Sequence, residues 1–454
     1  MLKFGKRPGV RNFWAMMSLL LAVLLVAAAC VPAGGPAPQG DQAERPPEAG
    51  APQGPSGTVR IGSWDSGEAL EPFNNAIAAY ESANPNVDIQ LEAVPQEYGT
   101  KLLAQLAAGT APDIFQVGDG DVAKFVARDV VEPLEPYING NNPLDMDVFF
   151  PNVAQFGIVN GQVYYLTKDY SPLVLYYNKD LFDEAGLSYP TGEWTWDDLL
   201  TAAQALTVRD DSGQVTRWGI QLPDTWGDLY WLRGILPIIY QGGGSVISED
   251  GTTVQGHINS PETVAALEWY VALFKEHGVA PDNADLEALA GVDLFQNGMV
   301  AMVWTGRWPL KDYLANESLN FGVSGLPTGP AGKANVLCWA GFALNKASEN
   351  KETAWDFLKY IAAGDGAKEF ANYAFTAVRA IAESQHLDTD EYNAPIIADL
   401  ENVRPLPEFT NPRFQECVET PFKEQLERVF LEDISVQEAM DAVAASAEAC
   451  LAAE

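Results

Sequence analysis

Short apolar runs alternate with amphipathic segments in the first part of the folded chain. Their spacing predicts three strands and two helices, in the order 58–62, 71–83, 87–94, 98–108 and 114–117. Strands that alternate with helices favour an α/β fold with a mainly parallel sheet. Ligands of such sheets bind beyond the C-terminal ends of the strands. Trp64, Asp65 and Asp119 follow two of these strands, so we expect them at one edge of the sheet.

A polar and aromatic segment in the middle of the chain precedes a buried strand. Residues 168–172 are predicted to turn, and the apolar run at residues 173–177 predicts the strand. A short helix at residues 178–185 then ends at Gly186, as helices with a left-handed C-cap commonly do. Such a turn indicates where the chain crosses between two lobes and leaves side chains facing a cleft.

Helix caps and apolar runs predict the elements of the remaining chain. Four residues are predicted to cap helices: Thr195, Ser260, Ser348 and Ser435. The last belongs to a Ser435-x-x-Glu438 capping box. A further helix is predicted at residues 286–297, strands at residues 218–222, 300–304 and 321–326, and a strand pair at residues 336–345.

The N-terminus is typical of an export signal. Basic residues precede an apolar segment at residues 13–29, which ends in Ala27-Ala28-Ala29 directly before Cys30. This pattern resembles a bacterial lipobox, although Leu is commoner than Ala27 at its position. A transmembrane anchor and an ordinary secretory signal are the alternatives. We expect residues 1–29 to be a lipoprotein signal peptide, Cys30 to carry the lipid, and the Pro/Gly/Ala-rich residues 30–57 to form a tether.

Length and charge narrow the class of protein. The chain has 454 residues, which suits two lobes after a leader. Its formal net charge of -35 repels nucleic-acid phosphates and anionic lipid headgroups. Nucleic-acid binding is therefore excluded.

Aromatic residues stand beside an acid, an amide or a guanidinium at several predicted strand ends. Sugars need this pairing, because their C–H faces pack on aromatic planes while their hydroxyls bind charged or bidentate groups. The alternative is that these aromatic residues fill cores and the acids are solvated. The set is Trp64, Asp65, Asp119, Asp169, Tyr170, Tyr230, Trp231, Arg307, Trp308 and Trp339.

No motif for catalysis, for a cofactor or for a metal is present. The three histidines are isolated, and the sequence has no P-loop and no nucleophile elbow. A glycosidase needs only two carboxylates, and Asp119 and Asp169 are not excluded from that role. Cys338, Cys417 and Cys450 remain after the leader; the last two either pair or stay thiols.

Five ordered motifs resemble the family 1 extracellular solute-binding proteins that feed ABC importers. The motifs are residues 109–114 (Gly-Thr-Ala-Pro-Asp-Ile), 175–182 (Leu-Tyr-Tyr-Asn-Lys-Asp-Leu-Phe), 194–199 (Trp-Thr-Trp-Asp-Asp-Leu), 295–302 (Phe-x-Asn-Gly-x-x-Ala-Met) and 341–346 (Gly-Phe-Ala-Leu-Asn-Lys). The resemblance covers residue 58 to the C-terminus. It implies a type II periplasmic-binding-protein-like fold, in which two hinged α/β lobes with mainly parallel sheets close on a ligand cleft.

The resemblance also implies lobe boundaries and binding positions. Residues 58–168 with 334–375 would form the N-terminal lobe, and residues 169–333 with 376–454 the C-terminal lobe. The crossings would lie near residues 168–171, 327–336 and 374–379. The matching binding positions are Trp64, Asp65, Asp119, Asp169, Tyr170, Ser171, Tyr230, Trp231, Trp308 and Trp339, with Arg379 at the third crossing.

The expected function is capture of a sugar and its delivery to an ABC permease. Where maltose-type proteins carry an acid at the crossing, this chain has Ser171, with Asp169 two residues earlier. That departure weakens the case for maltose but not for a carbohydrate. We expect a monomeric, extracytoplasmic lipoprotein that is not an enzyme and needs no cofactor or metal. The alternatives are a binding protein for a polyamine or glycerol phosphate, and an exported glycosidase.

Overall fold

The structure is a computed structural model that describes residues 54–222, 229–371, 373–404, 406–407, 411–432 and 434–453. For Asp119 and Asn152 it describes the backbone but not the side chain. The predicted leader, Cys30 and most of the predicted tether lie outside the described residues. Within the described ranges, no helix combines the length and the apolar character needed to cross a bilayer.

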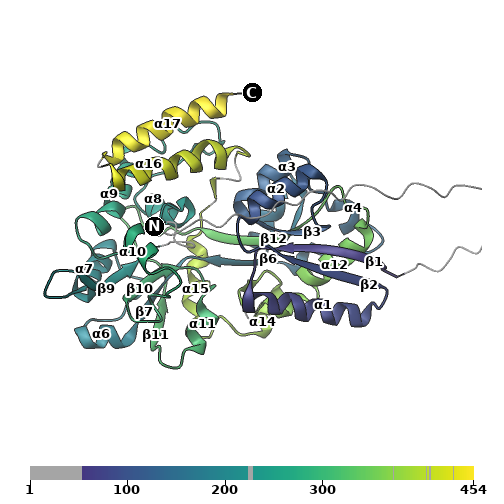
Figure 1. Cartoon of the computed structure of the whole chain (residues 1–454), viewed down its shortest axis with the longest axis horizontal. Helices are drawn as coiled ribbons and strands as arrows, with labels where there is room; N and C mark the ends of the chain where they lie inside the picture. Colours follow the sequence, from purple (N-terminus) through teal and green to yellow (C-terminus); the bar gives the residue numbers. More distant parts are fainter. Residues whose placement is uncertain are drawn as a thin grey trace, which may run out of the picture. The chain divides into compact units, whose positions relative to one another are not determined.

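Strands from distant parts of the chain form a six-stranded sheet in the order β13-β6-β12-β3-β1-β2. The strands are β1 (Gly57–Ser63), β2 (Val87–Ala93), β3 (Ile114–Gly118), β6 (Tyr165–Pro172), β12 (Leu337–Leu344) and β13 (Phe375–Thr376). β1 pairs in parallel with β2 and β3, whereas β12 and β13 pair with antiparallel neighbours. In Figure 1, β6 and β12 run side by side toward the second sheet.

The second large sheet has five strands in the order β11-β7-β10-β9-β8. They are β7 (Val174–Asn178), β8 (Val208–Arg209), β9 (Val215–Gln221), β10 (Val300–Thr305) and β11 (Phe321–Ser324). Only β9 and β10 are parallel in this sheet of the described chain. A separate small hairpin pairs β4 (Ile158–Val159) with β5 (Gln162–Val163).

The expectation of mainly parallel sheets is wrong, because both large sheets are mixed. Alternation of strands and helices holds from β1 to β3, where helices carry the chain back for parallel pairing. β6 leaves the first sheet toward the second lobe and β12 returns from it, so these two strands run antiparallel. In the second sheet, β8 and β9 pair antiparallel across a short connection.

Helices cover both faces of the six-stranded sheet and form one lobe with it (Figure 1). They are η1 (Gly67–Leu70), α1 (Glu71–Ala83), α2 (Tyr98–Ala108), η2 (Asp119–Asp121), α3 (Val122–Ala127), α4 (Glu135–Ile138), η3 (Met146–Val148), α5 (Pro151–Ala154), η4 (Gln155–Gly157), α12 (Lys351–Ala363) and α13 (Ala367–Phe370). α1 buries Phe73, Ala76, Ile77 and Tyr80 at helical spacing. The Phe73 ring contacts Phe370 edge-on, with centroids 4.9 Å apart, and so seals the core under α1.

The second lobe surrounds the five-stranded sheet. Its helices are α6 (Lys179–Ala185), α7 (Trp196–Leu206), α8 (Leu232–Gln241), α9 (Pro261–Lys275), α10 (Asn283–Ala288), α11 (Leu310–Ala315), α15 (Ala394–Ala398) and η5 (Asp399–Asn402), while α14 (Arg379–Ser384) follows β13 and contacts it. α7 starts at the predicted Thr195 cap, which forms a capping box with Asp198, and α9 starts at the predicted Ser260 cap. Trp196 of α7 stacks on Trp269 of α9 with centroids 4.2 Å apart, which fixes the two helices together.

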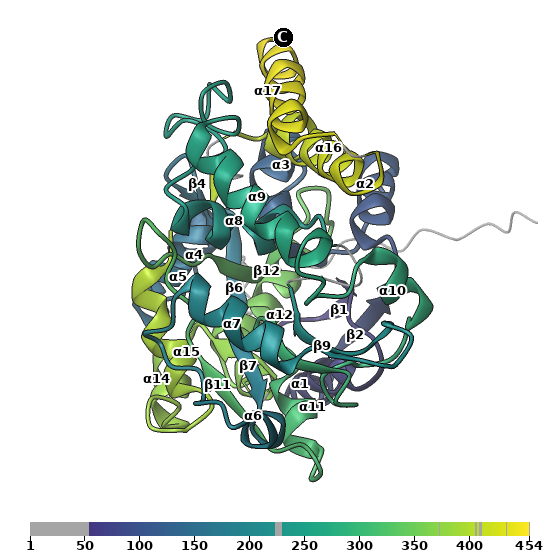
Figure 2. The ribbon, with the colours of Figure 1, turned by 90° about the vertical axis from the view of Figure 1, so that its left-hand side faces the viewer.

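The C-terminal segment adds a π-helical turn, η7 (Gln415–Glu419), and the antiparallel pair α16 (Thr420–Leu431) and α17 (Val436–Ala452). Figure 2 shows this pair at the end of the molecule next to α9. The predicted Ser435–Glu438 capping box begins α17. Cys417 and Cys450 form a disulfide, which decides between the two interpretations that the sequence left open.

Asn335 ties two crossings between the sheets to each other. The chain leaves the first sheet at Pro172 and enters the second at Val174; it returns after Ser324 to start β12. The Asn335 Nδ2 donates to the Leu173 carbonyl at 2.7 Å, and the Leu173 N–H donates to Asn335 Oδ1 at 3.2 Å. The buried Asp399 accepts a further bond from Asn335 Nδ2. This network fixes the spacing of the two crossing segments.

Several predicted elements are wrong in detail. Residues 168–172 form part of β6 rather than a turn, and residues 336–345 contain one strand rather than two. The helix predicted at residues 286–297 is the shorter α10, which begins at an Asp282 capping box. Ser348 does not cap α12; its Oγ donates to Asp113 at 2.6 Å instead.

Candidate ligand-binding site

A buried glutamine holds the polar end of β1. Gln116 lies within β3, and its Oε1 accepts bonds from Ser63 Oγ at 2.6 Å and from the Trp64 N–H at 3.2 Å. Its Nε2 donates to Asp65 Oδ2 at 3.0 Å. Every polar group of this buried side chain is therefore bonded, as burial requires. The Asp65 carboxylate is consequently fixed beyond the strand end.

Lys168 joins this network from β6. Its Nζ lies 2.7 Å from Asp169 Oδ2 and 3.9 Å from Asp65 Oδ2. The ammonium also lies over the rings of Phe370 and Phe73, at 5.2 and 5.9 Å. Burial acts to lower the pKa of Lys168, but Asp169 and Asp65 together outweigh it and raise that pKa above its ordinary value. Lys168 is therefore a charged link between the two carboxylates.

Trp64 lies where β1 and β3 end side by side. Its indole contacts Tyr98 edge-on with centroids 5.5 Å apart, and a Cβ built on Gly118 would lie 4.0 Å from the indole edge. The parallel pairing of β1 with β3 brings Trp64, Asp65 and the backbone of Asp119 to one edge of the sheet. The Asp119 side chain lies outside the described residues.

Arg307, Ser171 and Tyr170 meet where the two sheets approach each other. The Arg307 N–H donates to Ser171 Oγ at 2.8 Å, and its Nε donates to Asn393 Oδ1 at 2.7 Å. The guanidinium lies 4.6 Å from the Phe375 ring, on which Tyr170 also packs. Burial lowers the pKa of Arg307, while neighbouring acidic groups act in the opposite direction. All three predicted residues are buried, so they support the junction between the lobes.

Trp308 is the most exposed of the predicted aromatic residues. Its side chain is 45% exposed. The indole folds back over its own chain, because a Cβ on Gly306 would lie 1.9 Å from the ring. Only glycine at position 306 permits this close approach. The Gly-Arg-Trp segment after β10 therefore presents one open aromatic face.

Four other predicted residues are less exposed than Trp308. Trp339 is buried, and its Nε1 donates to Thr167 Oγ1 at 2.9 Å. Tyr230 is buried against Phe430. Trp231 is half-buried at the N-cap of α8, and Arg379 donates from Nη2 to the Asp147 carbonyl.

Sequence reasoning missed Gln116 and Lys168. The signal for Gln116 was a polar residue within an otherwise apolar strand, next to the strand end that carries Asp65. Lys168 was placed in a turn, although alternation in β6 turns it toward Asp65. Within the described ranges, no group of three or more His, Cys, Asp or Glu side chains is placed to hold a metal ion.

Residues 64–377 match the family model of bacterial extracellular solute-binding proteins. This stretch spans more than half of the chain and both lobes. The chain belongs to that family. Members are extracellular, which places this solute-binding protein outside the cytoplasm.

Curated relatives of this solute-binding protein have different cargoes. The maltodextrin-binding protein MdxE of Bacillus subtilis is 27% identical over 70% of this chain and 71% of its own. The sn-glycerol-3-phosphate-binding periplasmic protein UgpB of Shigella dysenteriae is 25% identical over 68% of this chain and 71% of its own. A binding protein of Brucella abortus is 26% identical over 72% of this chain and 76% of its own.

Solved structures share the fold of this solute-binding protein across both lobes. The ABC substrate-binding protein Lmo0181 of Listeria monocytogenes, solved with cycloalternan, has a TM-score of 0.78 at 25% identity and covers 87% of this chain and 99% of its own. The GacH receptor of Streptomyces glaucescens has a TM-score of 0.74 at 22% identity and covers 87% of this chain and 98% of its own. The two mixed sheets and their crossings are thus the type II periplasmic-binding-protein fold, as expected from the sequence.

Proposed function

We propose that this solute-binding protein captures a carbohydrate, either an oligosaccharide or a glycoside, and delivers it to the permease of an ABC importer. The observation that carries the proposal is the edge of the first sheet, where Trp64 stands beside the bonded carboxylates of Asp65 and Asp169. The names of MdxE and of the Lmo0181 complex agree with it.

The chemistry of this edge suits a polyhydroxylated ring. An indole face packs on sugar C–H groups, and a carboxylate that is already oriented accepts sugar hydroxyl bonds without further ordering. Trp308 offers an open indole face from the other lobe. Trp64, Asp65, Asp119, Asp169, Trp231 and Trp308 are the proposed ligand contacts.

The remaining predicted residues have supporting roles in this proposal. Tyr170, Ser171 and Arg307 hold the junction between the lobes, so they position the ligand contacts rather than touch the ligand. Tyr230, Trp339 and Arg379 are used in packing or in bonds within the fold.

The position of Lys168 favours a carbohydrate over the alternative ligands. A polyamine would need free carboxylates, but Lys168 already pairs with both Asp65 and Asp169. A glycerol phosphate would meet two carboxylates at the same edge, and like charges repel. A neutral sugar avoids both penalties.

Capture would proceed by closure of the lobes around the ligand. We assign residues 58–172 and 334–375 to one lobe and most of the remaining folded chain to the other, which shifts the first boundary to the end of β6. A ligand that contacts both lobes favours the closed state by its differential affinity. The same closure would present the loaded protein to its permease.

Lipidation of Cys30 is the proposed means of retention at the membrane. The leader supplies a basic start and an apolar segment that ends directly before this cysteine. Metabolic labelling with a palmitate analogue should mark the unmodified chain but not Cys30→Ser. Equal labelling of both chains would contradict the proposal. We also propose that the mature protein is a monomer.

A thermal-shift screen tests the ligand class. The mature chain with Cys30→Ser is heated with neutral oligosaccharides, polyamines or glycerol 3-phosphate. A ligand of the folded state adds about 2.7 kcal/mol of stability at a hundredfold excess over its Kd. We expect sugar hits that are insensitive to salt, since no net charge is bound. A polyamine or phosphate hit with silent sugars would overturn the substrate, and release of reducing ends over time would indicate a glycosidase.

Substitution of Trp308 tests the site itself. Trp308→Ala removes the open indole face and should abolish the sugar-induced shift, while the melting temperature without ligand changes little because the ring is half exposed. Tyr189→Ala removes another exposed aromatic ring of the same lobe and is the matched control. An unchanged shift in Trp308→Ala would refute its role as a contact.

A further inference from the structure

The two lobes contact each other directly through Lys124 and Gln415. Lys124 belongs to α3, which follows β3 in the first lobe, and its Nζ donates to Gln415 Oε1 at 2.9 Å. Gln415 begins η7, which leads into the helix pair packed on the second lobe. A Cβ on Gly120 would lie 3.6 Å from Arg233 Nη2 and 4.0 Å from Gln415 Nε2, so the backbone also approaches closely here. We name the Lys124–Gln415 pair the α3 latch.

A second contact joins the lobes through Lys311, Tyr373 and Glu71. Lys311 of α11 donates from Nζ to Tyr373 Oη at 2.6 Å, and that hydroxyl donates to Glu71 Oε2 at 2.7 Å. The Lys311 Nζ also lies 3.9 Å from Glu71 Oε2 and 3.8 Å from the centre of the Tyr373 ring. Glu71 is the first residue of α1, which covers the first sheet. We name this group the α11 latch.

The two latches lie on opposite sides of the crossing strands. Both views place α3 and α16 on one side of β6 and β12, and α1 and α11 on the other (Figures 1 and 2). The α11 latch joins two helices that follow proposed contacts, since Trp308 lies two residues before α11 and Trp64 and Asp65 lie before α1. None of the five latch residues is a proposed ligand contact.

We propose that these two latches hold the lobes in the closed arrangement and set how readily the protein opens. The proposal rests on the proposed capture of ligand by closure. The latches consist of partly exposed groups, so each stabilises closure modestly, as surface pairs do. Together they bias the lobes toward closure before any ligand binds, and a ligand then completes the shift.

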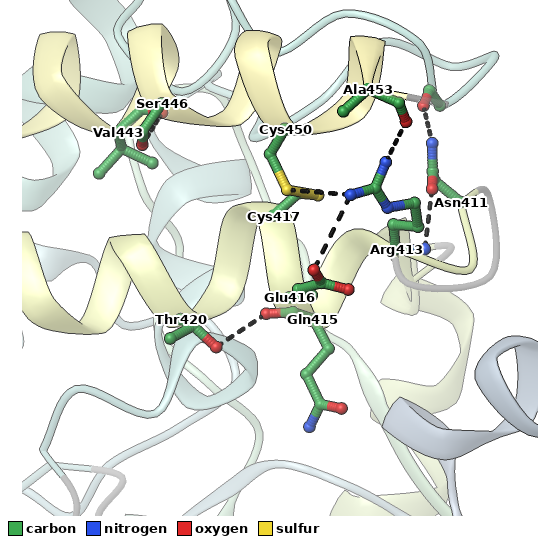
Figure 3. The surroundings of a disulfide bond; sticks show 11 residues. Asn411, Arg413, Gln415, Glu416, Cys417, Thr420, Val443, Ser446, Cys450 and Ala453 are labelled. Carbon is green, nitrogen blue, oxygen red and sulfur yellow. Dashed lines mark hydrogen bonds and ion pairs between the residues drawn. A yellow bond between two sulfur atoms is a disulfide. The ribbon is translucent and has the colours of Figure 1, made fainter.

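The disulfide anchors the α3 latch. Cys417 lies within η7, two residues after Gln415, and is linked to Cys450 of α17. Figure 3 shows that the Gln415 amide points away from the disulfide, while Arg413 binds Ala453 and Cys450 on the other side. The disulfide thus holds the turn from which Gln415 contacts the other lobe. Reduction is expected to weaken the α3 latch and to leave the α11 latch intact.

Small-angle X-ray scattering of the mature protein without ligand tests the proposal. Gln415→Ala and Lys311→Met should each raise the open-to-closed ratio about fivefold, as expected when a surface pair is lost, and so enlarge the radius of gyration. The double variant Gln415→Ala/Lys311→Met should have a larger radius of gyration than either single variant. Gln425→Ala and Lys368→Met are matched controls, because their side chains bond only to near neighbours in the chain.

Reduction provides the second arm of the test. Dithiothreitol should enlarge the radius of gyration of the unmodified protein to that of Gln415→Ala, with no further change in Gln415→Ala itself. Circular dichroism after reduction checks that the fold persists. An unchanged radius in the double variant would overturn the latches, and equal effects of reduction with and without Gln415 would overturn the role of the disulfide. These measurements need no ligand, so they can fail while the sugar screen succeeds.

Discussion

Buried polar side chains decide the geometry of the candidate site at the scale of single residues. A buried amide is unfavourable unless all its groups are bonded, and Gln116 meets this requirement only through Ser63, Trp64 and Asp65. The sequence indicated Asp65 as a candidate because it follows a strand. It did not indicate Gln116, because the pairing of β1 with β3 creates the partner.

Substitution of Gln116 tests this network. Gln116→Met keeps the length of the side chain but leaves Ser63 and Asp65 without their partner, so we expect a loss of about 1–3 kcal/mol in unfolding free energy. Sugar affinity should fall as well, because Asp65 is no longer fixed. Gln90→Met, on the exposed face of β2, is the control and should change stability by about 0.5 kcal/mol or less. Urea unfolding measures both; equal stabilities would contradict the network.

Ionisation of the buried Tyr170 hydroxyl is expected to destabilise the protein at alkaline pH. Burial raises its pKa to about 12 from an ordinary value of 10.0, with Arg307 acting in the opposite direction. The unfolded chain therefore loses this proton first as pH rises above 10, and stability is lost progressively up to about pH 12. Between pH 10 and pH 12, Tyr170→Phe should lose about 3 kcal/mol less unfolding free energy than the unmodified protein. At neutral pH this ionisation should make no difference between the two proteins. Urea midpoints across this range check it; identical pH slopes would refute the assignment.

At the scale of elements, the sequence correctly predicted those helices whose start and spacing depend on neighbouring residues alone. α1 and α2 follow their predicted bounds, and α7 starts after its predicted cap, because caps and helical spacing depend on only a few neighbouring residues. β6 was missed because pairing with β12 and β13 imposes strand structure on a polar segment. α10 was misplaced because the Asp282–Asp285 capping box starts it early and Gly291, at φ 84°, follows its end. Tertiary pairing and reciprocal caps explain these errors.

The capping box of α17 gives a prediction at this scale. Ser435 Oγ accepts the Glu438 N–H and Glu438 in turn accepts the Ser435 N–H. Ser435→Ala removes one of these bonds and should cost about 1 kcal/mol of unfolding free energy. Ser446→Ala, within the same helix, is the control; its Oγ bonds only to the Val443 carbonyl, so alanine should be neutral or better. Thermal unfolding compares the two variants; a larger loss in Ser446→Ala would contradict the role of the cap.

At the scale of the whole molecule, the sequence predicted two hinged lobes but not which aromatic residues face the cleft. Trp308 and Trp339 both follow or occupy strands beside glycines, yet one is 45% exposed and the other is buried. The difference arises because β12 lies in the middle of the six-stranded sheet, whereas Trp308 follows the end of β10. A single sequence does not contain the order of strands, which crossings and lobe packing establish.

A larger side chain at Gly120 is expected to keep the two lobes apart. A Cβ there would touch Arg233 and Gln415 at ordinary distances, so the further carbons of Gly120→Leu would overlap groups of the other lobe. They would meet no obstacle once the lobes part. The variant should therefore stay folded but open, with a larger radius of gyration. Apparent sugar affinity should fall in proportion to the closed fraction, about tenfold for a tenfold smaller fraction.

The control for Gly120→Leu is Gly192→Leu, whose Cβ would lie 3.9 Å from Lys333 Nζ within one lobe. It should change neither the radius of gyration nor the affinity. A Gly120→Leu protein as compact as the unmodified one would mean that the loop after β3 yields instead of the lobes. The α3 latch would then follow movements of that loop, and closure would depend on the α11 latch and the ligand alone.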